Sequence, residues 1–304
     1  MIISVLVPTY NAEPYIIDLI DRLKAQELMN DYSLEIIIID SSSTDNTVNI
    51  VKNRYPEIYI ETINNRNFNH GTTRNYLASI ASGEYLVFMT QDAIPRNNRL
   101  IMNLWENLQS SDCMISYAKQ VPRNDASILE QFARSFNYPH KKVVKDINKI
   151  KELGIKTFFN SNVCSMYKAE LFKSPYNGFP NDIILNEDMI LASKVIFDGK
   201  KVVYEPNAEV YHSHNYNLKQ QFKRYFDIGM AFNETSFLLE HVSNEKEGMR
   251  MVTMQIKYLL SKNKAYLIPY CVMENAVKLI SYNLGKRYTL LPRKLKSKWS
   301  AYSK

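Results

Sequence analysis

Residues 85–95, Tyr85-Leu86-Val87-Phe88-Met89-Thr90-Gln91-Asp92-Ala93-Ile94-Pro95, join a short apolar run directly to one carboxylate and a proline. A continuous apolar run of this length, preceded by Ser82-Gly83, is typical of a buried parallel strand rather than of a helix. Ligands of open α/β sheets bind beyond the carboxyl ends of the strands. The position of Asp92 therefore suggests a divalent metal that bridges to a phosphate, and a solvated helix cap before Pro95 explains it equally well.

The chain before this stretch alternates between apolar strands and amphipathic helices. The pattern predicts strands over 3–7, 34–39, 58–63 and 85–89. It also predicts one helix that begins at about residue 14, a second that ends at about residue 55, and a third over 72–82. This alternation predicts an α/β fold whose mostly parallel sheet is flanked by helices, with right-handed crossovers.

The chain beyond residue 95 mixes further strands with helices and then becomes helical. The pattern predicts helices over 100–109, 125–137 and 187–198, strands over 114–120, 158–167 and 201–204, and a charged, loop-rich segment over 141–156. From Leu218 the pattern is helical to near the end, with breaks at Asn263 and Pro269. We therefore predict a sheet domain over 1–215 and a helical C-terminal region over 216–304.

The number of cysteines and the absence of long apolar runs indicate the cellular compartment of the protein. Cys113, Cys164 and Cys271 are scattered without metal-like spacing, which fits a reducing cytosol. Residues 1–8 lack a basic region and a cleavage site, so they are interpreted as a first strand and not as a signal peptide. No run reaches the roughly 18–20 apolar residues that a membrane span needs. These features predict a cytoplasmic protein.

The excess positive charge lies in the C-terminal tail. The segment after Gly285 holds seven Lys and Arg and no Asp or Glu, and these seven account for the whole excess of 38 basic over 31 acidic residues. Such a tail, with Tyr, Leu and Trp interleaved, suits an anionic membrane surface, at about 1 kcal/mol per basic residue. Nucleic acid is the rival ligand, but no nucleic-acid-binding motif accompanies the tail. A solvated, frayed terminus also stays open.

Acidic residues and histidines follow several predicted strands. Asp40 and Asp92 each end a buried strand, Glu187-Asp188 begins a helix, and His212 and His214 follow the strand near residue 204. Carboxylates and imidazoles gathered at one sheet edge describe a metal or acid–base site. Each residue alone has a structural explanation, such as a helix cap, and only their joint placement favours a site.

Several of these motifs carry a family resemblance. The stretches Val5-Leu6-Val7-Pro8-Thr9-Tyr10-Asn11 and Ile38-Ile39-Asp40-Ser41-Ser42-Ser43-Thr44-Asp45 resemble the amino-terminal signature of family 2 inverting glycosyltransferases with the GT-A fold. Residues 68–75, Phe-Asn-His-Gly-Thr-Thr-Arg-Asn, and Gln91-Asp92-Ala93-Ile94-Pro95 resemble the bacterial rhamnosyltransferase branch of that family. The resemblance covers about residues 3–230.

The resemblance implies a role for each matching residue. Donor and nucleotide binding would fall to Pro8, Thr9, Tyr10, Asn11, Asp40, His70, Arg74, Gln91 and Asp92. Asp188 would be the catalytic base, with Glu187 beside it shaping the acceptor pocket. A Mn²⁺ or Mg²⁺ ion would be held by Asp92 with His212 or, alternatively, His214. The acceptor or diphosphate side would be formed by Asn160, Ser161, Gln221, Arg224 and Tyr225, the last three standing in a QxxRW-like motif with Tyr for Trp.

Two departures from the family pattern affect the metal site. The usual DDGS reads Asp40-Ser41-Ser42-Ser43 here, and the usual DxD reads Thr90-Gln91-Asp92. Fewer carboxylates mean weaker intrinsic affinity for a metal, so the donor diphosphate must supply more of the coordination. The rhamnosyltransferase branch shares both changes.

The resemblance also implies the substrates. The donor would be dTDP-β-L-rhamnose, and inversion would give an α-L-rhamnosyl linkage on a lipid-linked saccharide at the inner face of the plasma membrane. Three alternatives stay open: a family 2 enzyme with a UDP-hexose donor, a sugar nucleotidyltransferase, and a non-catalytic scaffold subunit. The glycine-rich loop of a nucleotidyltransferase is replaced by Asn11-Ala12-Glu13-Pro14. The C-terminal helices could equally form a homodimer.

Overall fold

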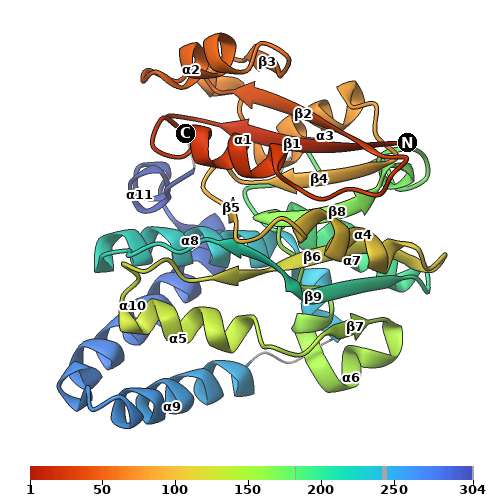
Figure 1. The fold of residues 1–304 in the computed structure, drawn as a ribbon. Helices are drawn as coiled ribbons and strands as arrows, with labels where there is room; N and C mark the ends of the chain where they lie inside the picture. Colours follow the sequence, from red (N-terminus) through yellow and green to blue (C-terminus); the bar gives the residue numbers. More distant parts are fainter. Residues whose placement is uncertain (182, 242–244, 303–304) are drawn as a thin grey trace.

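The computed structural model describes residues 1–181, 183–241 and 245–302. Within this part of the chain a nine-stranded sheet runs in the order β3-β2-β1-β4-β8-β6-β9-β5, with β7 paired to β9 (Figure 1). The strands are β1 (Ile2–Thr9), β2 (Ser33–Asp40), β3 (Tyr59–Thr62), β4 (Tyr85–Met89), β5 (Ile94–Pro95), β6 (Cys113–Val121), β7 (Val143–Lys145), β8 (Cys164–Lys168) and β9 (Lys201–Tyr211).

Helices cover the sheet and continue beyond it. They are α1 (Ile16–Lys24), α2 (Thr47–Arg54), α3 (His70–Ile80), α4 (Leu100–Leu108), α5 (Ile128–Asn137), α6 (Ile150–Leu153), α7 (Glu187–Phe197), α8 (Leu218–Glu234), α9 (Glu245–Ser261), α10 (Ile268–Lys286) and α11 (Arg293–Trp299). None of these described helices is both long enough and apolar enough to cross a membrane.

The parallel half of the sheet is built by β1 to β4. β1 pairs in parallel with β2 on one side and with β4 on the other, and β3 extends the same parallel set. The strand interiors are fully buried, with Val5, Val87 and Ile39 at 0% exposure, which is why the sequence shows unbroken apolar runs there. The carboxyl ends of these strands therefore meet at one edge, as predicted.

The second half of the sheet corrects three sequence predictions. The strand expected over 158–167 begins only at Cys164, because the preceding asparagines turn their side chains toward the Tyr167 hydroxyl. The strand expected to end at Tyr204 continues to Tyr211 past Pro206, because a register irregularity against β6 places that proline outside the ladder. The segment 141–156 holds β7 and short helices rather than loop alone.

The C-terminal helices pack on one another at a close crossing. A Cβ on Gly229 of α8 would lie 2.2 Å from the carbonyl oxygen of Tyr282, and one on Gly285 of α10 would lie 2.1 Å from that of Phe226. Only glycine allows the two backbones to approach this closely. The predicted breaks are confirmed, since Asn263 takes a positive φ of 55° and Pro269 stands in the first turn of α10.

Candidate active site

Three side chains that could hold a metal come together at the carboxyl ends of β4 and β9. A carboxylate oxygen of Asp92 lies 3.5 Å from His212 Nε2 and 3.3 Å from His214 Nε2, and the two imidazole nitrogens are 3.1 Å apart. All three ligand atoms fall within 4.8 Å of one another. Asp92 follows β4 by three residues and the histidines follow β9, so the meeting of these strand ends creates the site.

His212 is held in the form that binds metals. Its Nδ1 donates to Gln120 Oε1 at 2.9 Å, and Arg134 donates to the same oxygen. Burial, reinforced by the charge of Arg134, lowers the pKa of His212 well below its usual range. A neutral ring that donates from Nδ1 leaves the Nε2 lone pair directed toward Asp92. Burial also lowers the pKa of His214, against the opposing effect of Asp92.

A buried ion pair links α3 to the start of α7. Arg74 Nη1 donates to Glu187 Oε1 at 2.9 Å, and the two side chains are only 4% and 7% exposed. Asn162 Nδ2 donates to the same carboxylate oxygen at 3.1 Å. The ionised form of Glu187 is thus held by a cation and an amide, and its pKa stays lowered although burial alone would raise it. Arg74 thus pairs with Glu187, and its contact with the donor diphosphate stays a prediction.

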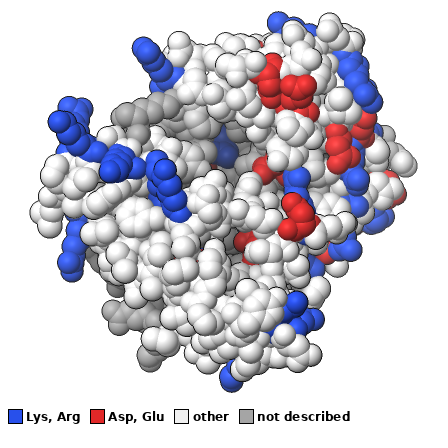
Figure 2. Space-filling model, turned by 90° about the vertical axis from the view of Figure 1, so that its left-hand side faces the viewer, with Lys and Arg blue, Asp and Glu red and all other residues white. Residues whose placement is uncertain are grey.

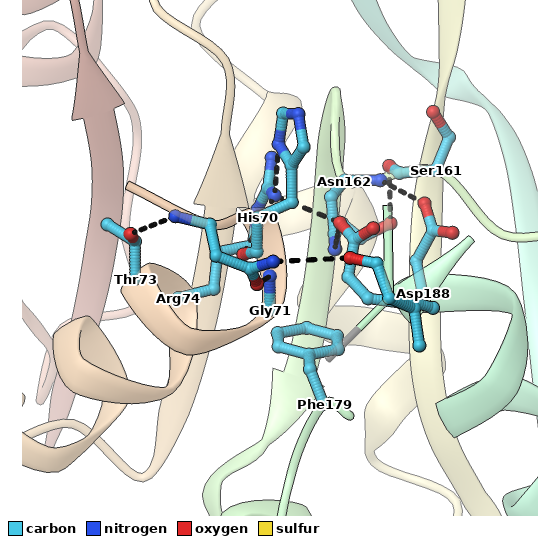
Figure 3. Close-up of polar contacts among 12 residues, drawn as sticks. His70, Gly71, Thr73, Arg74, Ser161, Asn162, Phe179 and Asp188 are labelled. Atoms are coloured by element: carbon cyan, nitrogen blue, oxygen red, sulfur yellow. Dashed lines mark hydrogen bonds and ion pairs between the residues drawn. The ribbon is translucent and has the colours of Figure 1, made fainter. Parts of the chain in front are cut away.

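Asp188 stands next to this pair in a different environment. Its carboxylate accepts from the backbone N–H of Asn162 at 3.0 Å and from its own helix at Met189. Burial, with the neighbouring negative charge of Glu187, raises the pKa of Asp188 to about 7. Figure 3 shows Asp188 and Asn162 facing His70 and Arg74 of α3 across the site. A carboxylate with this pKa can accept a proton near neutral pH.

His70 presents an unused donor at the same place. Arg74 Nη1 approaches His70 Nδ1 at 3.2 Å, and a cationic donor there requires that nitrogen to be the acceptor. The proton of the neutral ring is then on Nε2, a buried atom without a hydrogen-bond partner among the described residues. Burial and the charge of Arg74 lower the pKa of His70 to about 4. His70 is therefore a neutral donor available to a ligand oxygen.

The residues expected to bind the nucleotide mainly brace the ends of β1 and β2. Asp40 is fully buried and accepts from Thr9 Oγ1 at 3.1 Å and from the backbone of Ser43 at 2.8 Å. Pro8 pairs with Ile39 in the parallel ladder. The structure shows a structural brace at Asp40, and contact with a base stays a prediction.

The loop after β1 is joined to the neighbouring loops through side-chain amides. Gln91 exchanges two hydrogen bonds with the backbone of Tyr10, at 2.7 and 2.9 Å, while the Tyr10 ring is 47% exposed. Asn11 Oδ1 accepts from the backbone N–H of Thr44 at 2.8 Å. Gln91 thus connects the loop after β1 to the loop after β4 that holds Asp92, and the Tyr10 side chain is left accessible.

The residues expected on the acceptor or diphosphate side divide between the site and its support. Asn160 is buried and donates to the Tyr167 hydroxyl at 2.6 Å, and Ser161 accepts from Gln120 at 3.0 Å. Both therefore support the loop before β8.

On α8 the three motif residues have different surroundings. Arg224 stacks over the Tyr216 ring at 5.5 Å and has no ion-pair partner in the part of the chain described here. Tyr225 instead lies under Lys278 of α10, with 5.5 Å from Nζ to the ring centroid. Gln221 lies one turn before Tyr225 on the same helix. Arg224 is thus a cation available to a ligand anion.

The sequence analysis missed three residues of this region. Gln120 orients His212, Asn162 contacts both Glu187 and Asp188, and the Tyr302 ring lies 5.3 Å from the ring of His70. Gln120 lies within a strand and Tyr302 is more than two hundred residues from His70, so no local pattern marks either. Asn162 belongs to an Asn-Ser-Asn stretch that was predicted to be part of a strand. The presence of polar residues in that predicted strand was the one feature that could have indicated a functional role.

Together these side chains form a site at one edge of the sheet. It combines one proton acceptor with a neutral hydrogen-bond donor and a cation, both of which can stabilise an anion. Figure 2 looks onto this side of the molecule and shows its surface hollowed at the centre. The base candidate Asp188, the neutral donor His70 and the cation Arg224 come from three different helices. The Asp92–His212–His214 cluster adds a set of metal ligands. Such a constellation suits displacement of an anionic leaving group by a hydroxyl.

Comparison with known proteins agrees with this chemistry. Residues 4–174 match the model of glycosyl transferase family 2. The chain is 37% identical over 294 residues to the O-antigen chain rhamnosyltransferase RfbN of Salmonella typhimurium, covering 96% of this chain and 92% of that protein. It is also 37% identical over 291 residues to WbaN of Salmonella anatum, described by the same activity, with 95% and 90% covered.

Solved structures show the same fold at low sequence identity. The mannosyltransferase PcManGT of Pyrobaculum calidifontis, in complex with GDP-Man and Mn²⁺, aligns with a TM-score of 0.59 at 18% identity, over 98% of this chain and 83% of that one. Staphylococcus aureus TarS aligns with a TM-score of 0.57 at 16% identity, over 95% and 91%. These matches confirm the predicted GT-A fold. The family match and the Salmonella relatives establish that the chain belongs to glycosyl transferase family 2.

Proposed function

We propose that this protein transfers L-rhamnose from dTDP-β-L-rhamnose to a hydroxyl of a lipid-linked saccharide, with inversion to an α-linkage, in the synthesis of a bacterial surface polysaccharide. The observation that carries the reaction type is the environment of Asp188, whose raised pKa of about 7 suits a general base. The rhamnosyl donor is supported by the 37% identity to the two Salmonella rhamnosyltransferases over most of the chain.

In the proposed reaction one displacement occurs at the anomeric carbon. The acceptor oxygen forms its bond to that carbon as its proton moves to the Asp188 carboxylate. The bond to the diphosphate oxygen breaks on the opposite face, and its electron pair leaves with the diphosphate. Arg224 supplies positive charge to the leaving group, and His70 Nε2–H donates to a substrate oxygen. Glu187, neutralised by Arg74, shapes the acceptor side without competing for the proton.

The residues of the proposed metal site fit Mn²⁺ better than Mg²⁺. Asp92, His212 and His214 offer one carboxylate oxygen and two imidazole nitrogens. Imidazole suits transition metals, whereas Mg²⁺ prefers oxygen ligands. When bound, the ion would neutralise the charge that develops on the leaving diphosphate. We therefore expect higher activity with Mn²⁺ than with Mg²⁺.

Substitution of Gln120 tests the proposed metal site without removing any of the metal ligands. Because Gln120 holds the His212 ring through Nδ1, Gln120→Ala should lower the affinity for Mn²⁺ by about 10–100-fold. Isothermal titration of Mn²⁺ in the presence of dTDP measures this directly. The matched control is Gln109→Ala, an amide at the end of α4 whose side chain, among the described residues, donates to the Tyr85 hydroxyl and the Trp105 carbonyl oxygen. Unchanged affinity in Gln120→Ala would contradict the assignment of His212 as a ligand.

The donor is tested by calorimetric titration with dTDP-rhamnose and UDP-glucose, each with and without Mn²⁺. We expect Mn²⁺-dependent binding of dTDP-rhamnose and at least tenfold weaker binding of UDP-glucose. Preference for UDP-glucose would retain the family and the reaction but overturn the rhamnosyl donor. Binding of neither nucleotide would favour the scaffold alternative.

The lipid-linked acceptor places the proposed reaction at the cytoplasmic face of the plasma membrane. The basic tail after Gly285 supports a peripheral association with that surface, since its cations would meet anionic lipid. Lys304 of this tail lies outside the described residues. The division between a catalytic domain over 1–215 and a helical region over 216–304 is part of the same proposal.

A further inference from the structure

The helix α10 presents apolar side chains to the outside of the molecule. Val272 and Met273 are 50% and 45% exposed, and Leu279 and Ile280 are 63% and 57% exposed. Their spacing of seven residues places both pairs on one face of the helix. Contiguous exposed apolar surface of this kind marks an interaction site rather than ordinary surface variation.

The opposite face of α10 is fixed against the protein. Gly285 crosses Gly229 of α8 in backbone contact, and Ser281 is fully buried. Glu274 on the same inner face is buried and forms an ion pair with Lys278. The helix therefore has polar groups inside and apolar groups outside, and its rotation cannot simply bury the outer face. Leu279 and Ile280 can therefore be buried only by contact with something outside this molecule.

Cations stand at both ends of the outward apolar face. Lys286 and Arg287 lie seven residues beyond Leu279 and Ile280, so they extend the same stripe by two turns, and both are exposed. Lys262 and Lys264 are exposed just before the helix. No Asp or Glu follows Glu274 in the sequence. Figure 2 shows one side of the molecule where Lys and Arg stand without Asp or Glu, whereas the opposite side of the view carries both signs of charge.

The tryptophan of the basic tail packs inside the fold. Trp299 packs edge-on against Phe222 and Phe226 of α8, at 5.8 and 5.9 Å between ring centroids. Ser300 is 3% exposed, and the backbone of Ala301 donates to Asp227 at 2.8 Å. The tail thus offers charge to a membrane but not its tryptophan. Its exposed Leu290, at 81%, is a single apolar side chain, whereas α10 offers two pairs of exposed apolar side chains.

We propose that the outward face of α10 inserts into the interface of an anionic lipid bilayer, with the flanking cations on the lipid headgroups. An amphipathic helix that lies in the membrane plane combines these two features. A second copy of the chain fits less well, because cations at both ends would bring like charges together in either orientation of a self-paired face. The inference rests on the proposed function in one respect, namely that a lipid-linked acceptor requires the enzyme to work at a membrane.

The insertion can be followed with a fluorophore on the helix itself. The native cysteines are buried, so Leu279→Cys can be labelled selectively with an environment-sensitive dye. We expect a blue shift of the dye with phosphatidylglycerol–phosphatidylcholine vesicles, a much smaller one with phosphatidylcholine alone, and loss of the shift at about 1 M salt. The control is Ile147→Cys, an exposed apolar site outside α10 at 46% exposure against 63% for Leu279, where no shift is expected.

Vesicle co-sedimentation of the full chain tests the energetic contribution. Leu279→Asn/Ile280→Asn should weaken partitioning onto the anionic vesicles by about tenfold or more, because two exposed apolar side chains no longer enter the interface. Val144→Asn/Ile147→Asn should leave it unchanged. Binding to vesicles without a shift at position 279 would overturn the proposal. So would a lipid-independent shift accompanied by a doubled mass, which would identify a second copy. No nucleotide sugar is present, so a wrong donor assignment would not affect either result.

Discussion

Replacement of Asp188 by asparagine is expected to lower the transfer rate by about 10²–10⁴-fold while leaving donor binding nearly intact. The asparagine keeps the size of the side chain and can still accept from the backbone of Asn162, but it cannot take the proton of the acceptor hydroxyl. Single-turnover transfer from dTDP-rhamnose measures the loss, and calorimetry with the same donor measures the binding. Asp31→Asn, in an exposed turn distant in sequence from the site, is the control.

The pH profile gives the same assignment an independent test. A base is active in its carboxylate form, so activity should rise with pH and level off above the Asp188 pKa of about 7. Well below that pH the rate should fall about tenfold per unit, as the protonated fraction grows. The residual activity of Asp188→Asn should lack this acid limb. Full activity in that variant, or an unchanged acid limb, would contradict the assignment of Asp188 as the general base.

Replacement of Arg74 by methionine is expected to destabilise the protein by about 3–5 kcal/mol, because it leaves the Glu187 carboxylate buried without its cation. Urea unfolding followed by circular dichroism measures the change in the free energy of unfolding. Loss of the positive charge also favours the protonated form of Asp188. Any activity that survives should therefore show its acid limb at higher pH.

An exposed ion pair provides the comparison for this result. Arg54 donates to Asp21 at 2.8 Å, with both side chains about half exposed at 53% and 47%. Arg54→Met should cost at most about 1 kcal/mol, because such pairs are screened by water. Arg74→Met/Glu187→Gln should recover part of the lost stability, since no uncompensated charge remains. Equal losses in Arg74→Met and Arg54→Met would show that the buried pair has no special importance.

The sequence by itself determined the class of fold and the edge at which the site forms. Unbroken apolar runs at Val5 and Val87 indicate buried parallel strands, and parallel strands bring their carboxyl ends together. That rule is local and periodic, so it predicted that Asp92 and the residues after β9 would share an edge. The motifs around Asp40 and Asp92 then indicated the family, which the comparisons confirmed.

Only the tertiary structure decided how the side chains are paired. Arg74 and Glu187 are 113 positions apart, and His212 and Gln120 are 92 apart, so no spacing in the chain predicts either contact. The same holds for α10, whose apolar residues would ordinarily be assigned to the core. Periodicity reveals that a helix has two faces, whereas the direction of each face depends on the elements packed against it. At α10 the Gly229–Gly285 crossing turns the polar face inward and the apolar face outward.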